Sequence, residues 1–83
     1  MFRVLVKTSA QKSLKKLDTR YQPKILRALH VLASDPYIGK SLLGELVGFY
    51  SLRVWPYRII YQLMKSQRTV FVVAIDHRQS VYS

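Results

Sequence analysis

The sequence contains no cysteine, and this absence removes two structural options at once. Without thiols the chain can form neither a disulfide framework nor a thiolate metal site. Acidic residues are almost as scarce, because the 83 residues include only four of them: Asp18, Asp35, Glu45 and Asp76. They are scattered along the chain, and with the histidines they form no pattern that has the spacing of metal ligands. We therefore expect no metal ion, and we expect the protein to act in the reducing cytoplasm.

Long apolar runs and phosphate-binding glycine patterns are also missing. No apolar stretch approaches the ~20 residues that a membrane-spanning helix needs. The N-terminus MFRVLVKTSA becomes basic too early for a signal peptide. The three glycines match neither a P-loop nor a dinucleotide-binding pattern. We expect a single domain over residues 1–83 that holds no cofactor and crosses no membrane.

Positive charge is the feature that is abundant. Fourteen lysines and arginines face four acidic residues, which gives a formal net charge of +10. A field of this strength attracts polyanions and speeds their association with the protein. Nucleic acid is the expected partner, and an anionic membrane surface or an acidic protein remains an alternative.

The first third of the chain has the pattern of a strand followed by two helices. Residues 2–7 alternate in polarity, as a strand does, and residues 9–18 carry apolar side chains at helical spacing. A second apolar stripe at helical spacing ends before Pro36, because the residue that precedes proline resists the helical conformation. The pair Thr8 and Gln11 predicts a capping box at the start of the first helix.

The rest of the chain predicts three strands. Residues 37–48 hold all the glycines and predict a loop. Residues 49–55 and 57–64 predict a hairpin that turns at Trp-Pro-Tyr, and the β-branched run 69–75 predicts a central strand. The predicted fold is α+β with the order β-α-α-β-β-β, in which two N-terminal helices pack on one face of a mainly antiparallel four-stranded sheet.

Strand alternation places two arginines of the hairpin on one face. If Leu52 and Ile59 lie under the helices, Arg53 and Arg58 emerge on the face that the helices leave open. A solvated surface is the simpler interpretation of this pair. The net charge and the C-terminal segment favour the alternative, which is a basic binding face.

The C-terminal segment IDHRQSVY places His77, Arg78 and Tyr82 just beyond the end of the central strand. Strand ends and the loops that follow them often carry chemistry. His77 is the plausible carrier of a proton near neutral pH. A surface histidine and a tyrosine packed at an edge are the simpler interpretations.

A resemblance to a known family rests on three segments: a lysine-rich helix pair that ends in LASDP, then GFYSLRVWPYRIIYQL, then VVAIDHRQSVY. Together they resemble the RelE-type toxins of prokaryotic toxin–antitoxin systems over essentially the whole chain. The resemblance implies a metal-independent endoribonuclease that cleaves ribosome-bound mRNA, inhibits translation and is suppressed by a RelB-like antitoxin protein. The ParE-type toxins share the fold but inhibit DNA gyrase, so this activity remains an alternative. A non-catalytic, basic nucleic-acid-binding module is a third interpretation.

The resemblance also implies the site residues. Arg53 and Arg58 match the basic strand residues of the family, Arg78 matches its basic residue after the last strand, and Tyr82 matches its C-terminal tyrosine. His77 occupies a position where several relatives also carry histidine.

Two departures from the family pattern lie beside these residues. Ser51 stands where some relatives place a catalytic lysine, and Trp55-Pro56 stands where the family usually has a turn that contains glycine. Cleavage of RNA without a metal requires the ribose 2′-OH to attack the adjacent phosphorus while a base, cations and an acid assist. Arginine suits the cationic role, because it binds phosphate oxygens bidentately and stays protonated.

Overall fold

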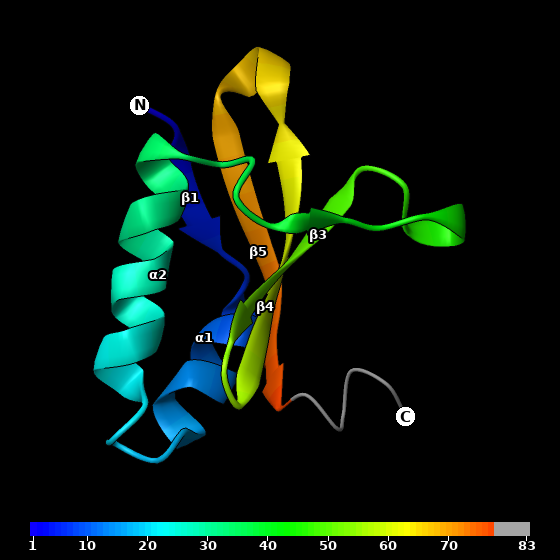
Figure 1. Cartoon of the computed structure of the whole chain (residues 1–83). Coiled ribbons are helices and arrows are strands. Elements are labelled where there is room, and N and C mark those ends of the chain that lie inside the picture. Colours follow the sequence, from blue (N-terminus) through cyan, green and yellow to red (C-terminus); the bar gives the residue numbers. More distant parts are fainter. Residues whose placement is uncertain (78–83) are drawn as a thin grey trace.

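The computed structural model describes residues 1–77 of the chain (Figure 1). Arg78 and Tyr82, which the sequence singled out, lie outside the described residues. In chain order the elements are β1 (Arg3–Val6), α1 (Thr8–Lys16), α2 (Gln22–Ser34), β2 (Lys40–Ser41), η1 (Gly44–Leu46), β3 (Phe49–Val54), β4 (Tyr57–Met64), η2 (Lys65–Gln67) and β5 (Thr69–His77). The α+β class and the order of the predicted elements are confirmed.

The sheet has five strands in the order β1-β5-β4-β3-β2, and it is mixed. β1 pairs with β5 in parallel, while the other three pairings are antiparallel. The predicted four-stranded sheet therefore lacked one strand, because Lys40–Ser41 leaves the predicted loop and pairs with β3. The parallel pairing gives β5 a neighbour on each side, which suits a strand that is apolar over most of its length.

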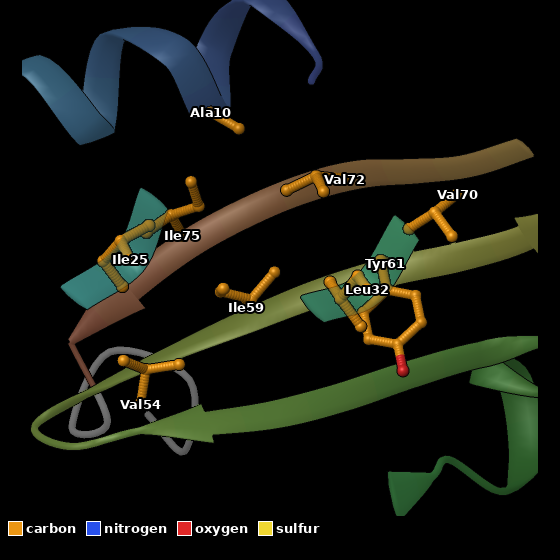
Figure 2. Close-up of a cluster of buried hydrophobic side chains, with 9 residues drawn as sticks. All are labelled: Ala10, Ile25, Leu32, Val54, Ile59, Tyr61, Val70, Val72 and Ile75. Carbon is orange, nitrogen blue, oxygen red and sulfur yellow. The ribbon is translucent and has the colours of Figure 1, made fainter. Parts of the chain in front are cut away.

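Both helices cover one face of the sheet. Ala10 of α1 and Ile25 of α2 pack into the same core as the inward side chains of β3, β4 and β5. Figure 2 shows the nine buried side chains of this core: Ala10, Ile25, Leu32, Val54, Ile59, Tyr61, Val70, Val72 and Ile75. In Figure 1 the two α-helices lie on the same side of the sheet, and the other face carries no α-helix among residues 1–77.

A one-residue bulge interrupts β5 where it pairs with β4. Ile60 lies opposite Ala74, but the next residue, Tyr61, lies opposite Val72, so Val73 has no partner in this ladder. A bulge shifts the alternation of side chains by one residue. As a result Val72 and Ile75, which strict alternation would place on opposite faces, both point into the core.

The helix starts differ from the predicted capping box. α1 has Lys7 at its N-cap position with no side-chain cap, and Gln11 instead donates its side-chain N–H to the Val6 carbonyl at 2.8 Å. β3 and β4 are joined by Trp55 and Pro56, which are linked by a cis peptide bond. Lys24 of α2 donates to the Trp55 carbonyl at 3.1 Å, so the helix supports this turn.

Candidate functional site

Arg53 and Arg58 lie directly opposite each other on β3 and β4. The neighbouring pair, Leu52 and Ile59, faces the helices, and Ile59 is fully buried. Because side chains alternate along a strand, the two arginines emerge on the helix-free face, which we call the open face. The prediction that these two residues share a face is confirmed. Arg53 is exposed, and Arg58 is partly buried.

Ser51 contacts Arg58 on the open face. The Nη1 of Arg58 donates a hydrogen bond to the Ser51 hydroxyl at 3.3 Å, and Ser51 is only 7% exposed. Ser51 thus holds the guanidinium close to the sheet. On the other side of Arg58, the partly buried Asp76 lies opposite it on β5 and therefore shares its face. The bulge at Val73 produces this placement, and the sequence alone had not distinguished Asp76 from the other scattered carboxylates.

His77 lies on the face opposite to the arginines. It is the last residue of β5, paired with Tyr57, rather than a residue beyond the strand as the sequence predicted. Its ring meets the Tyr57 ring edge-on at a centroid distance of 5.6 Å, and Tyr57 in turn meets Tyr21 beside α2 at 5.6 Å. The structure therefore brings Arg53 and Arg58 together and places the His77 side chain with the aromatic residues of the helix-covered face.

Lys40 joins the basic residues of the open face, although the sequence placed it in a loop. It pairs with Ser51 across β2 and β3, and it is exposed. A strand of two residues is too short to show alternation, so the periodicity of the sequence could not reveal it. Lys40, Arg53 and Arg58 thus occupy three consecutive strands, and we call these three residues the basic strip.

The open face also carries apolar side chains on β1 and β5. Leu5 of β1 lies opposite Phe71 of β5, and Phe71 lies opposite Gln62 of β4. Leu5 is 46% exposed, and Phe71 is partly buried. The open face therefore carries apolar side chains, Leu5 and Phe71, in addition to the basic strip.

Within residues 1–77, no group of three or more histidines and carboxylates could hold a metal ion. No helix in the same range is long and apolar enough to cross a membrane. Asp18 pairs with Arg20 in the connection between the helices, at 3.0 Å. The hydrogen bonds from Arg20 hold the pKa of Asp18 below its ordinary value, so this carboxylate stays ionised and contacts its neighbour.

The fold agrees with the comparisons to known proteins. A family model described as the ParE toxin of type II toxin–antitoxin systems, parDE, matches residues 4–82. The toxin RelG of Mycobacterium tuberculosis is 34% identical over 77 residues, which cover 90% of this chain and 88% of RelG. The chain therefore belongs to the ParE toxin family, within the RelE/ParE superfamily of toxins from type II toxin–antitoxin systems.

Solved structures show the same fold. The toxin–antitoxin complex RelBE2 of Mycobacterium tuberculosis contains a chain that matches with a TM-score of 0.86 and 32% identity, covering 93% of this chain and 98% of that chain. The isolated toxin RelE of Escherichia coli matches with a TM-score of 0.78 and 24% identity, covering 99% of this chain and 92% of that chain. Because the Escherichia coli toxin is only 24% identical, its similarity supports the fold alone.

Proposed function

We propose that this protein is the toxin component of a toxin–antitoxin system and acts in the cytoplasm as an endoribonuclease that cleaves ribosome-bound mRNA without a metal ion. Cleavage of mRNA during decoding would inhibit translation. The observation that supports this activity most directly is the pair Arg53 and Arg58, set opposite each other on the open face with Arg58 held by Ser51.

In the proposed reaction the ribose 2′-oxygen loses its proton and attacks the adjacent phosphorus. The bond from phosphorus to the 5′-oxygen then breaks, and that oxygen receives a proton. The products are a 2′,3′-cyclic phosphate and a 5′-hydroxyl end. Arginine N–H groups aimed at the phosphate oxygens would stabilise the additional negative charge of the transition state, which is commonly the largest catalytic contribution. Arg53 and Arg58 take this role, and the family resemblance adds Arg78.

The sequence offered two candidate proton carriers, Tyr82 and His77. Tyr82 is proposed to move a proton or to stack on a base. His77 is retained as a candidate, but its ring lies against Tyr57 on the helix-covered face. From there we propose that it anchors the end of β5, immediately before Arg78, instead of contacting the scissile phosphate.

The proposed protein partner is a RelB-like antitoxin that is acidic and amphipathic. A groove of about 430 Å³ runs between β1 and α2, and its lining is mostly apolar. Its lining residues are Val4, Val6, Leu26, Leu29, His30 and Ala33. Leu26, which is one of these lining residues, is 49% exposed. The chain carries a net charge of +10. An apolar groove on so basic a domain suits a segment that has apolar residues on one side and acidic residues on the other.

The antitoxin proposal can be tested with any small acidic protein that proves to be encoded beside this gene. Leu26→Glu should weaken binding at least tenfold, because it places a charge in the apolar groove. Val31→Glu is the matched control, since Val31 is also exposed on α2 but does not line the groove. Wild-type binding should weaken as salt rises. Equal binding of both variants, or no binding to the wild type, would contradict the proposal.

Gyrase inhibition is the second candidate function, because the matching family model is that of the ParE toxin. The two activities are separated by adding the protein in parallel to ribosomes programmed with mRNA and to a DNA gyrase supercoiling reaction. We expect cleaved mRNA and normal supercoiling. Intact mRNA together with inhibited supercoiling would replace the endoribonuclease proposal with the gyrase alternative. Intact mRNA together with normal supercoiling would favour a non-catalytic binding module.

A further inference from the structure

The short strand β2 carries a lysine onto the open face. Lys40 pairs with Ser51 in the antiparallel ladder between β2 and β3. Side chains that are directly opposite in such a ladder share a face and have Cβ atoms about 5 Å apart. The Ser51 hydroxyl accepts a hydrogen bond from Arg58, which identifies this face as the open one. Lys40 therefore stands on the same face as the two arginines.

The backbone before Lys40 is fastened to the core by one buried tyrosine. The Tyr61 hydroxyl donates to the Pro36 carbonyl at 2.8 Å and accepts from the Gly39 N–H at 3.1 Å. Tyr61 is fully buried and stacks on Tyr50 with ring centroids 5.4 Å apart. Burial raises the pKa of Tyr61, so the hydroxyl stays protonated and continues to donate. Lys40 thus follows a segment that is held in a defined position.

Gly39 allows this close approach. A Cβ atom at position 39 would lie 2.6 Å from the Tyr61 hydroxyl oxygen, well inside van der Waals contact. The segment can therefore lie against Tyr61 only because residue 39 has no side chain. The conformation of 36–39 and the pairing of β2 together determine where the Lys40 side chain begins.

The spacing of the basic strip fits a nucleic-acid backbone. Neighbouring strands lie about 4.8 Å apart, and residues follow each other about every 3.3 Å along a strand. Lys40 and Arg58 are two strands apart and offset by two residues, so they start about 12 Å from each other. Two long, flexible cationic side chains at this separation can contact neighbouring phosphates of one strand. Ser51 between them is uncharged and nearly buried, so it leaves the space above β3 to Arg53.

We propose that Lys40 is a substrate-binding residue, whose ammonium group contacts a phosphate of single-stranded RNA next to the phosphate held by Arg53 and Arg58. The inference rests on the proposed function and names a contact within that site. Lys40 supplies positive charge and moves no proton. The competing role is that of a charged edge strand, in which an exposed lysine simply discourages pairing with another sheet.

The experiment measures binding of a single-stranded RNA oligonucleotide that carries a 2′-deoxy nucleotide at the scissile position, over a series of salt concentrations. Lys40→Ala should weaken binding by about tenfold at low salt. It should also reduce the slope of log K against log salt by about 0.7, the value for one lost phosphate contact on a single strand. Lys40→Arg should keep both values close to those of the wild type.

Lys12→Ala is the matched control, because it removes one exposed lysine from α1, on the other side of the sheet. Thermal unfolding of both alanine variants checks that neither has lost stability. If free RNA binds too weakly to titrate, the protein concentration that gives half-maximal single-turnover cleavage on ribosomes is compared instead. Indistinguishable values for Lys40→Ala and Lys12→Ala in the measurement used would overturn the inference.

The result also separates this inference from the proposed function. If the wild type cleaves mRNA and Arg58→Ala abolishes cleavage while Lys40→Ala behaves like Lys12→Ala, only the role of Lys40 is wrong. If Lys40→Ala lowers the affinity and the salt slope but the wild type cleaves no RNA on ribosomes, the endoribonuclease activity is wrong and the phosphate contact stands.

Discussion

The two faces of the sheet differ in what they expose. On the helix-covered face, Ile59, Tyr61 and Val72 are fully buried among the side chains of both helices. On the open face Arg53 and Lys40 are exposed, and Leu5 is 46% exposed. Burial of apolar surface stabilises the fold, whereas accessible cations can bind a polyanion. Substitutions on the first face should therefore act on stability, and substitutions on the open face should act on substrate binding and cleavage.

The largest effect on stability is expected in the core. Ile75→Ala removes buried methyl groups from a residue that is 1% exposed, so it should lower the free energy of unfolding by about 2–5 kcal/mol. Chemical denaturation measures this change. At a temperature where the variant remains folded, its single-turnover cleavage per folded molecule should equal that of the wild type. A specific loss of cleavage without a loss of stability would break the separation between the faces.

Arg58→Ala should instead slow cleavage strongly and change stability little. Removing one donor to the transition state typically costs about 10²–10³-fold in rate, and the free energy of unfolding should change much less than in Ile75→Ala. Arg27→Ala, which removes an exposed arginine from α2, is the matched control and should cleave at the wild-type rate. Single-turnover cleavage on programmed ribosomes provides the measurement. Equal rates for Arg58→Ala and Arg27→Ala would remove Arg58 from the site.

Tyr61 connects the two faces, because it lies in the core and fastens the segment that leads to Lys40. Tyr61→Phe leaves the Pro36 carbonyl and the Gly39 N–H without this partner, so it should cost about 1–3 kcal/mol of stability. Gly39→Ala should also destabilise, but by less in the Tyr61→Phe background, because the hydroxyl that a Cβ would meet is absent. Denaturation of the two single variants and the double variant measures this coupling, and simple additivity would contradict the contact.

The raised pKa of Tyr61 adds a dependence on pH. The stabilising effect of its neutral hydroxyl is complete below the ordinary value of 10.0 and is lost as the pH rises through the raised value. The stability difference between the wild type and Tyr61→Phe should therefore be constant near neutral pH and shrink above pH 10. A stability difference that grows above pH 10 would contradict a raised pKa of Tyr61.

The smallest effect is expected at His77. His77→Phe keeps an aromatic ring against Tyr57 but cannot titrate, so it should retain both stability and cleavage. His77→Ala loses the ring contact, and we expect a cost of about 1 kcal/mol in stability. A proton carrier would instead show a loss of about 10²–10⁴-fold in both variants and a changed pH–rate profile. That outcome would return His77 to the catalytic residues despite its position on the helix-covered face.

Periodicity in the sequence predicted the helices and the hairpin well, because both have a buried stripe that repeats over many residues. The same alternation placed Arg53 and Arg58 on one face. It could not reveal the bulge at Val73, since β5 is apolar on both sides and a shift of one residue leaves no mark in its pattern. That shift decides which face receives Asp76 and which receives His77.

Two other features depend on contacts between distant segments. β2 contains two residues, and its place at the sheet edge depends on the hydrogen bonds of Tyr61 to Pro36 and Gly39. The parallel pairing of β1 with β5 joins residues from opposite ends of the chain. Neither feature has a local signal in the sequence. The sequence could not assign Lys40 to the basic strip, because its face depends on the register of β2, which sets Lys40 opposite Ser51.

Attack by the ribose 2′-hydroxyl on the adjacent phosphorus of mRNA, promoted by the open face, is the step on which the proposed function depends. It is tested most directly by incubating the wild-type protein with ribosomes that carry either an all-ribose mRNA or the same mRNA with one 2′-deoxy nucleotide before the scissile phosphate, and by analysing the new ends. We expect a 2′,3′-cyclic phosphate and a 5′-hydroxyl from the first mRNA and no cleavage at that bond in the second. Cleavage of the 2′-deoxy mRNA at the same bond would contradict it.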